Sequence, residues 1–444
     1  MDSQNLRIRY LFPTLVIGGL VLGLASNGIA QLDQDLAEKV DILAEELAQL
    51  REQLSIPVTE KQRLEGQYGM SPVASKVYGG NQGISLGGYG EFYFASQLHN
   101  VDGNIGRNTG DFYRFVAYMG YKFNDSIIMN TEIEFEHATT AANWAGKSGS
   151  VSVEFAYLDF LITRPFNVRA GNLLVPMGFI NTLHEPVFYR GNFRPELERT
   201  IIPTTWRELG TGVHGSFGRG FQYTAYLING LDGDKFSEAG IRGGRQKGNR
   251  AAFEDFGLVG ALDWEHVGKF WIGGSYYYGG ADQNGMTNPD LTDISVTNWI
   301  GEVHLQFRHR GFEARAIYAA AGIDGANELT NVVYPDSADT RLVPDNQGGW
   351  YVDVAYDIAP LLFGQDVSFT LTPWFRYEDL KLQESVPSLG YRSANPSLDL
   401  QILTIGLESR LHQQVVVKLD YVTFDNKARV NPSDQIRLGA GFAF

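Results

Sequence analysis

The sequence of 444 residues contains no cysteine. This absence excludes disulfide bonds, thiolate metal sites and cysteine nucleophiles. Positive charge is also scarce, because 36 lysine and arginine residues stand against 51 aspartate and glutamate residues, which gives a net charge of −15 at pH 7. So acidic a chain is a poor partner for nucleic acid. Beyond the N-terminal region, no stretch reaches the ~18 uncharged apolar residues of a membrane-spanning helix. If the protein lies in a membrane, it must therefore lie there as a barrel.

Motifs for catalysis and for metal binding are lacking as well. No G-x-S-x-G segment marks a nucleophilic serine. His137, His184, His214 and His304 are scattered, without a metal-ligand pair at helical or short-loop spacing. We therefore predict that the protein is not an enzyme and has no catalytic residue, metal site or cofactor.

The N-terminus has the layout of an export signal. Arg7 and Arg9 precede an apolar run from Leu11 to Ala25, and the small residues Gly28 and Ala30 follow. This order predicts a secretory signal peptide over residues 1–30, cleaved after Ala30, with a membrane anchor as the alternative.

A short helical segment follows, over residues 31–57. Its apolar residues are spaced alternately by four and three, which is the heptad pattern of a coiled coil; they are Leu36, Val40, Leu43, Leu47, Leu50 and Leu54. Pro57 ends the predicted helix. Self-association is the simplest partner for so short and polar a helix, and a trimer is permitted; packing on another part of the protein is the alternative. Residues 58–83 are rich in glycine and are predicted to be a linker.

From residue 84 to residue 444 the apolar residues recur every second position. Val303 and Leu305, for example, alternate with Glu302, His304 and Gln306. Glycine, tyrosine and phenylalanine are abundant, with 51, 22 and 27 residues, and favour β structure. The pattern predicts sixteen strands: 84–96, 111–123, 126–137, 150–162, 167–175, 206–217, 220–231, 254–265, 268–280, 296–308, 311–322, 349–358, 365–379, 398–410, 413–424 and 434–444.

The connections between these segments alternate between long and short, which is typical of an outer-membrane barrel with an even number of strands. The predicted fold is therefore all-β, a sixteen-stranded antiparallel transmembrane β-barrel over residues 84–444, preceded by the short coiled coil. Lipid offers no partner for backbone groups, so the segment 84–96 must pair with 434–444. In that last segment, Leu438, Phe442 and Phe444 share the predicted outward face.

Several segments resemble, in their order and spacing, the phosphate-selective porin O/P family of Gram-negative outer membranes. They are GYGEFYF (88–94), YRFVAYMGYKFND (113–125), EIEFEHA (132–138), RAGNLLVPMGFINTLHEPVFYR (169–190) and ERTIIPTTWRELGTGVHG (198–215). The resemblance is clear over residues 84–231 and weaker after them. It implies a trimeric barrel that passes small hydrophilic solutes, often anions. The terminal Phe444 also resembles the C-terminal signature of outer-membrane proteins.

Charged side chains on the inward faces of the predicted strands are candidates for the pore lining. We predict that role for Arg114, Glu132, Glu134, Glu136, Arg308, Arg315, Arg376 and Lys418. Acidic residues outnumber basic ones on these faces.

The connection 176–205 is so long that a functional role is expected for it. It is rich in apolar and aromatic residues and contains three prolines between Pro186 and Pro203, so we expect it to be packed. We predict that it folds into the lumen and forms a constriction at which Arg190, Arg194 and Arg199 meet anions. The alternatives are that these arginines only pair with glutamates of the same loop, or that the loop packs against a neighbouring subunit.

These inferences predict a porin in the outer membrane of a Gram-negative bacterium, with its coiled coil in the periplasm. It would form a passive diffusion channel for small hydrophilic solutes, including anions such as phosphate. Its expected partners are outer-membrane lipid, two further copies of itself in a homotrimer, and peptidoglycan through the coiled coil. The alternative is a structural protein that tethers the membrane to the cell wall.

Overall fold

The computed structural model describes residues 67–98, 108–266, 268–336, 338–390, 392–430 and 432–444. The predicted signal peptide, the predicted coiled coil and residues 58–66 of the predicted linker lie outside the described residues.

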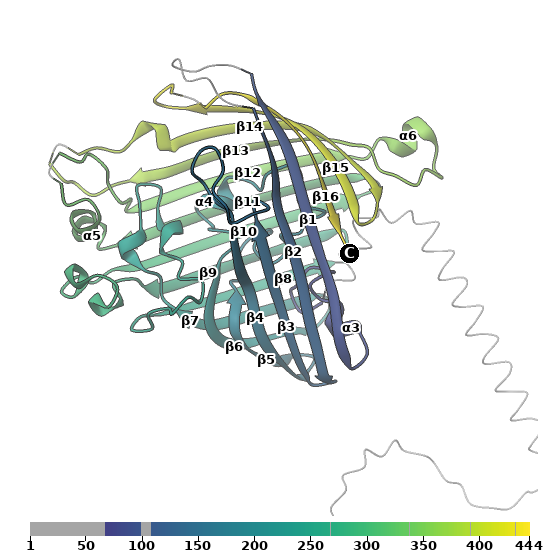
Figure 1. Cartoon of the computed structure of the whole chain (residues 1–444), viewed down its shortest axis with the longest axis horizontal. Coiled ribbons are helices and arrows are strands. Elements are labelled where there is room, and N and C mark those ends of the chain that lie inside the picture. Colours follow the sequence, from purple (N-terminus) through teal and green to yellow (C-terminus); the bar gives the residue numbers. More distant parts are fainter. Residues whose placement is uncertain (1–66, 99–107, 267, 337, 391, 431) are drawn as a thin grey trace, which may run out of the picture. The chain divides into compact units, whose positions relative to one another are not determined.

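Sixteen antiparallel strands form one closed barrel (Figure 1). The strands are β1 (Gly83–Gln97), β2 (Thr109–Asn124), β3 (Ile127–Glu136), β4 (Ser150–Thr163), β5 (Phe166–Leu174), β6 (Arg207–Phe217), β7 (Phe221–Asn229), β8 (Phe256–His266), β9 (Phe270–Gly280), β10 (Thr297–His309), β11 (Phe312–Asp324), β12 (Asn346–Tyr356), β13 (Thr372–Ser385), β14 (Asp399–His412), β15 (Val415–Asn426) and β16 (Gln435–Ala443). The predicted antiparallel β-barrel and its number of strands are confirmed.

The barrel is closed by pairing between its first and last strands. Tyr89 of β1 lies opposite Ala443 of β16, and the register continues to Gln97 opposite Gln435. The backbone N–H of Phe444 donates to Gly88 O, and the N–H of Gly88 donates to Phe444 O. The predicted pairing of 84–96 with 434–444 is therefore confirmed.

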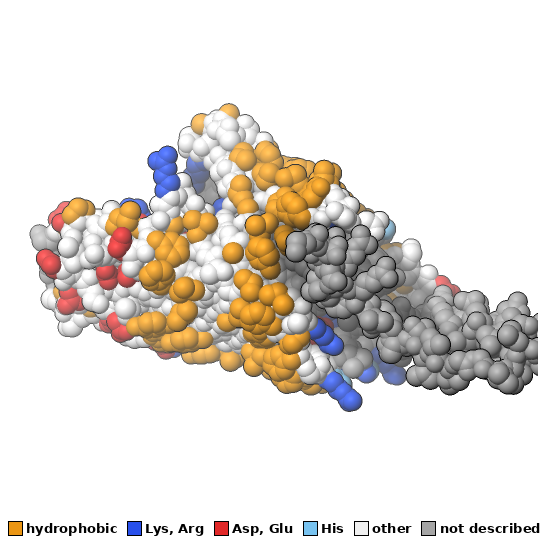
Figure 2. Space-filling view, turned by 90° about the horizontal axis from the view of Figure 1, so that it is seen from below, with side chains coloured by type: hydrophobic (Ala, Val, Ile, Leu, Met, Phe, Trp, Pro, Cys, Tyr) orange, Lys and Arg blue, Asp and Glu red, His pale blue; other side chains and the backbone are white. Residues whose placement is uncertain are grey.

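The period of two separates the two faces of the wall. On β10, Val303 is 62% exposed whereas Glu302 and His304 are buried. On β16, Leu438 and Phe444 are exposed, as predicted. Figure 2 shows the result, hydrophobic side chains spread over the outside of the barrel wall. None of the helices in the described part of the chain is long and apolar enough to cross a membrane.

The helical elements of the described residues are short and lie in the connections. They are α3 (Lys76–Gly79), α4 (Leu197–Thr200), α5 (Ala326–Val333) and α6 (Ala359–Phe363), with the 3₁₀ turns η1 (Gly233–Lys235), η2 (Ile241–Gly244), η3 (Gln283–Gly285), η4 (Pro289–Leu291) and η5 (Pro396–Leu398).

Most strand boundaries differ from the prediction by one to three residues, and the largest difference is in the thirteenth strand. The thirteenth strand was expected over 365–379, but β13 begins at Thr372, and α6 occupies the connection that precedes it. A carboxylate oxygen of Asp357 accepts hydrogen bonds from the backbone N–H groups of both Ala359 and Leu371, so it joins the two ends of this connection. Alternating residues at 367, 369 and 371 therefore imitate a strand within a capped turn.

The last part of the predicted linker packs inside the barrel at the end where the connections are short. In the segment 67–82, Val77 and Tyr78 are buried, and the hydroxyl of Tyr78 donates to Asp159 of β4 over 2.7 Å. A Cβ atom on Gly120 of β2 would lie 2.5 Å from Val77, so only glycine allows this approach. We name residues 67–82 the lumenal segment.

Candidate functional site

The connection between β5 and β6, residues 175–206, is named loop L3. Its helix α4 lies against β12 and β13, which are six to eight strands away from β5 and β6 around the ring of sixteen. L3 therefore crosses the lumen. Most of its side chains are buried, among them Phe179, Ile180 and Trp206, and they form the larger hydrophobic cluster together with inward residues of the wall.

Buried hydrogen bonds hold the far side of L3 to the wall. Lys418 of β15 donates to the backbone carbonyls of Tyr189 and Gly191 over 2.8 and 2.9 Å. The hydroxyl of Tyr189 donates to Glu91 of β1. Near α4, Glu378 of β13 accepts from Leu197 N–H at 3.0 Å. These bonds join L3 to β13, β15 and β1, a stretch of the wall away from β5 and β6, and keep the loop in the lumen.

Arg190 is buried and fully paired. Its guanidinium lies 3.2 Å from Glu313 of β11, 3.4 Å from Asp353 of β12 and 3.9 Å from Glu408 of β14. Its backbone carbonyl also accepts a hydrogen bond from Arg376. Arg190 thus anchors L3 to the wall. This role is close to the alternative in which the arginines only form ion pairs that hold the loop, although the partners of Arg190 are wall residues rather than glutamates of the loop.

Arg199 forms a two-pronged contact within the loop. Its Nε and Nη2 lie 2.7 and 2.6 Å from the two carboxylate oxygens of Glu196, and its side chain is 51% exposed. This residue therefore matches the alternative of ion pairs within the loop, with its charge shared by a neighbour and by water.

Arg194 differs from both. Within the described residues it has no ion pair, and its buried Nε and Nη2 atoms have no hydrogen-bond partner. The side chain lines the wide cavity above L3, at the end of the barrel where the connections are long. Of the three predicted constriction residues, Arg194 alone offers an unshared guanidinium.

This cavity, which we name the vestibule, has a volume of about 430 Å³. Six guanidinium groups and four carboxyl groups line it: Arg114, Arg194, Arg199, Arg242, Arg376 and Arg437, and Glu136, Glu196, Glu378 and Asp420. The chain is acidic as a whole, but the lining of the vestibule has an excess of positive charge.

Loop residues around the vestibule also have shifted pKa values. Burial, and then the neighbouring Arg245, lower the pKa of Arg242 to about 9. Arg242 donates to the carbonyl oxygens of Arg199 and Thr204, so it holds the C-terminal end of α4 and the segment that follows it. On the other side of L3, burial raises the pKa of Glu185 to about 7.

The predicted pore-lining residues face the lumen, but most of them are buried beneath L3. Arg315 donates to the carbonyl of Phe188 over 2.9 Å, and Arg376 lies 2.8 Å from Asp353. Glu136 is half-buried and borders the vestibule. The rest are buried next to polar or charged partners. Arg308 pairs with Glu313, Arg114 pairs with Glu91 and Glu134, and Glu132 lies beside His184. Lys418 donates to the backbone carbonyls of Tyr189 and Gly191.

Four charged residues in two buried pairs escaped the sequence reasoning. Glu154 of β4 lies beside His184 of L3 and pairs with Arg207 at 2.9 Å. A register shift between β3 and β4 turns both Glu154 and its neighbour Phe155 into the buried side, so strict alternation misplaces one of them. Asp159 and Arg169 form a second buried pair at 2.7 Å; both follow the alternation and could have been found from it.

A closed sixteen-stranded barrel whose third long connection, L3, lies in the lumen defines a porin-type β-barrel. Similar folds occur in OmpF of Salmonella typhi, solved in complex with daunomycin (TM-score 0.51, 15% identity, 81% of this chain and 97% of that chain), and in an anion-selective porin from Comamonas acidovorans (TM-score 0.50, 8% identity, 81% and 99%). A loop L8 deletion mutant of OmpT, an outer membrane protein of Vibrio cholerae, is also similar (TM-score 0.50, 11% identity, 81% and 99%). The chain therefore has the porin fold.

The sequence itself also has a relative. An uncharacterized protein of Aquifex aeolicus (strain VF5) is 33% identical over 365 residues, which cover 81% of this chain and 80% of that protein. The chain belongs to the family of that protein. No family model matches it, so the assignment to the phosphate-selective porin O/P family stays a prediction.

Proposed function

We propose that the protein is a porin of the outer membrane of a Gram-negative bacterium, a passive diffusion channel for small hydrophilic solutes that favours anions such as phosphate. L3 limits the size of the solutes that pass, and the charges above it bias the choice of ions. Localisation in the outer membrane is supported by the exposed apolar outer wall, with residues such as Ile84, Leu86 and Val303.

The observation that supports anion preference most directly is the vestibule. Its six guanidinium groups against four carboxyl groups attract anions, and one of the six, that of Arg194 in L3, has no ion pair within the described residues. A narrow passage screens fixed charges less than a wide aqueous one, so a small excess there outweighs the acidity of the whole chain. The predicted pore lining is also part of this proposal, with Glu136 and Arg376 at the vestibule.

Reconstitution of the purified protein in a planar lipid bilayer tests the function. Stepwise insertions should give discrete conductances, and a potassium chloride gradient should give a zero-current potential of the sign that marks anion preference. Added phosphate should reduce the chloride current, since both anions meet the same guanidinium groups. Insertion without conductance would favour the alternative function, a tether between membrane and cell wall. A cation-selective current would remove the anion part of the proposal.

The homotrimer is part of the proposal too, with the predicted coiled coil of residues 31–57 contributing to it from the periplasm. Sedimentation in detergent should show three chains per particle, and deletion of residues 31–57 should lower the temperature at which the trimer separates, because the seam loses six apolar side chains per chain. A trimer that is equally heat-resistant without these residues would assign them another task, such as contact with peptidoglycan.

A further inference from the structure

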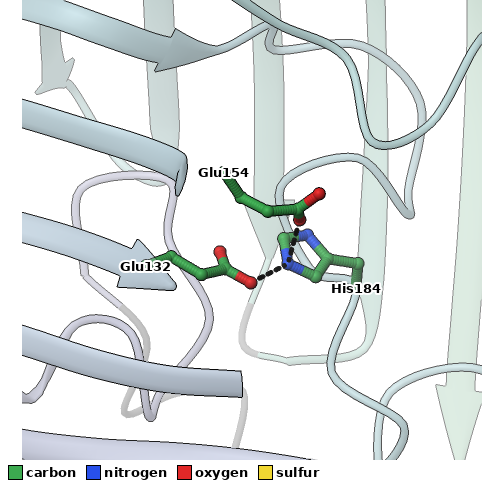
Figure 3. A group of neighbouring side chains, drawn as sticks. All are labelled: Glu132, Glu154 and His184. Carbon is green, nitrogen blue, oxygen red and sulfur yellow. Dashed lines mark hydrogen bonds and ion pairs between the residues drawn. The ribbon is translucent and has the colours of Figure 1, made fainter. Parts of the chain in front are cut away.

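Three buried side chains converge where L3 meets the wall. His184 of L3 points its Nε2 atom at Glu132 of β3 and Glu154 of β4 (Figure 3). The distances from this nitrogen are 3.0 Å to Glu132 Oε1 and 3.6 Å to Glu154 Oε2. One ligand atom from each of the three residues lies within 4.8 Å of the other two. All three side chains are at most 2% exposed.

The hydrogen bond of the Nδ1 atom of His184 determines whether its Nε2 atom can bind a metal ion. Nδ1 lies 2.9 Å from the backbone carbonyl oxygen of Asn181, and a carbonyl oxygen only accepts, so Nδ1 carries a proton. A neutral His184 then turns the lone pair of Nε2 toward two carboxylates. Such a hydrogen bond from the outer nitrogen to a carbonyl is the usual support of a metal-ligating histidine.

Two other buried histidines of the wall differ in this respect. His304 lies 2.9 Å from Asp263 through Nε2 and 2.9 Å from Glu302 through Nδ1, so its carboxylates sit on opposite nitrogens. His214 meets only Asp159. Among these three, His184 alone directs a single nitrogen at two carboxylates.

The carboxylates are also short of partners. Glu132 Oε2 and Glu154 Oε2 are buried and accept no hydrogen bond from the described residues. Glu134 lies beside Glu154. The register shift between β3 and β4 is what brings Glu154 to this point, and β-bulges often re-aim a side chain in this way at functional sites.

The charge of the surroundings points to a divalent cation. Five carboxyl groups gather here, those of Glu91, Glu132, Glu134, Glu154 and Glu185. Three guanidinium groups face them, those of Arg114, Arg194 and Arg207. Carboxyl groups thus outnumber guanidinium groups around the three side chains. One imidazole nitrogen with two carboxylate oxygens is a ligand set of zinc and related transition-metal ions, whereas magnesium and calcium prefer oxygen alone.

We propose that His184, Glu132 and Glu154 bind one divalent transition-metal ion, such as Zn²⁺, which fastens L3 to strands β3 and β4. A metal bond between the loop and the wall adds to the hydrogen bonds on the far side of L3, so both ends of the crossing loop are held.

The test uses the purified full-length protein in detergent, stripped with EDTA and titrated with ZnCl₂ in a calorimeter. Wild type should bind one Zn²⁺ per chain at the site formed by His184, Glu132 and Glu154. Loss of a supporting residue typically weakens metal binding ~10–100-fold, so H184Q and E132Q should weaken it by at least ~100-fold. H304Q is the matched control, because it removes a buried histidine with two carboxylate partners from a different place; it should leave the affinity unchanged.

Two further measurements use only the wild-type protein, so they do not depend on whether the variants fold. Co²⁺ added to stripped wild type should give the visible absorption of a low-coordinate nitrogen and oxygen site, and excess Zn²⁺ should remove it. Zn²⁺ should also raise the temperature at which wild-type barrels lose their heat resistance. If wild type binds Zn²⁺ no tighter than H184Q and shows no such Co²⁺ spectrum, the metal site is refuted, and the cluster is an ion-pair network that shares protons.

Discussion

R194Q is expected to move the zero-current potential toward cation preference further than R199Q does. Both variants remove one positive charge, so they are matched in net charge. Arg194 belongs to L3 and has no ion pair with a carboxylate of the described residues, whereas Arg199 is half exposed and shares its charge with Glu196. A unit charge about 4 Å from a passing ion is worth about 1 kcal/mol even in bulk water, which is roughly five-fold in local anion concentration.

We therefore expect R194Q to lower the ratio of anion to cation permeability roughly five-fold and R199Q to change it much less. The measurement is the zero-current potential in a planar bilayer across a salt gradient, repeated at high salt, where screening should reduce the difference between the variants. Equal shifts in both variants would mean that net charge alone matters. No shift in either would mean that solutes pass elsewhere in the barrel.

The second large effect is expected from R190M. This change keeps the length and the apolar stem of the side chain but removes the charge that faces Glu313, Asp353 and Glu408. Removing one partner of a buried ion pair typically costs about 3–5 kcal/mol, because the remaining charge stays buried without compensation. The strands keep their own hydrogen bonds, so the loss should fall on L3 rather than on the barrel.

We expect R190M to lower the unfolding temperature and to give larger and noisier single-channel conductances, since L3 is then held less firmly in the lumen. R341M is the control: Arg341 pairs with Asp339 in a connection and is 54% exposed, so neither quantity should change. Unchanged conductance together with unchanged heat resistance in R190M would show that the other contacts of L3 hold it without Arg190.

The sequence predicts the barrel well because a barrel wall repeats one simple rule. Alternation placed Glu132 and Glu134 on the inner side and Leu438 on the outer side, and both are observed. The rule fails where the backbone departs from it. Glu154 was missed because a bulge shifts the alternation, and the residues before Thr372 imitate a strand in a turn that Asp357 closes.

The roles of the loop residues were less accessible. Arg190, Arg194 and Arg199 look alike in the sequence, and what separates them is the position of partners more than a hundred residues away, such as Glu313. The lumenal segment was predicted as part of a linker because of its glycines, although its Val77 and Tyr78 are buried. Spacing within a loop carries no information about such contacts, since they depend on how the whole wall closes.

The seam between β1 and β16 has a consequence for the order of assembly. These strands are the two ends of the barrel, so their pairing has the largest loop-closure entropy of any contact in the wall and should form late. Both L3 and the lumenal segment lie inside the ring that this pairing completes. Once these two strands have paired, neither segment can enter through the wall and each can reach its place only from an open end of the barrel, so docking is easier while the sheet is still open. The rate-limiting step of folding is thus expected to be the pairing of β1 with β16 after L3 and the lumenal segment have docked on the open sheet. A change that delays the docking of L3 should therefore slow barrel formation even where the final barrel is intact.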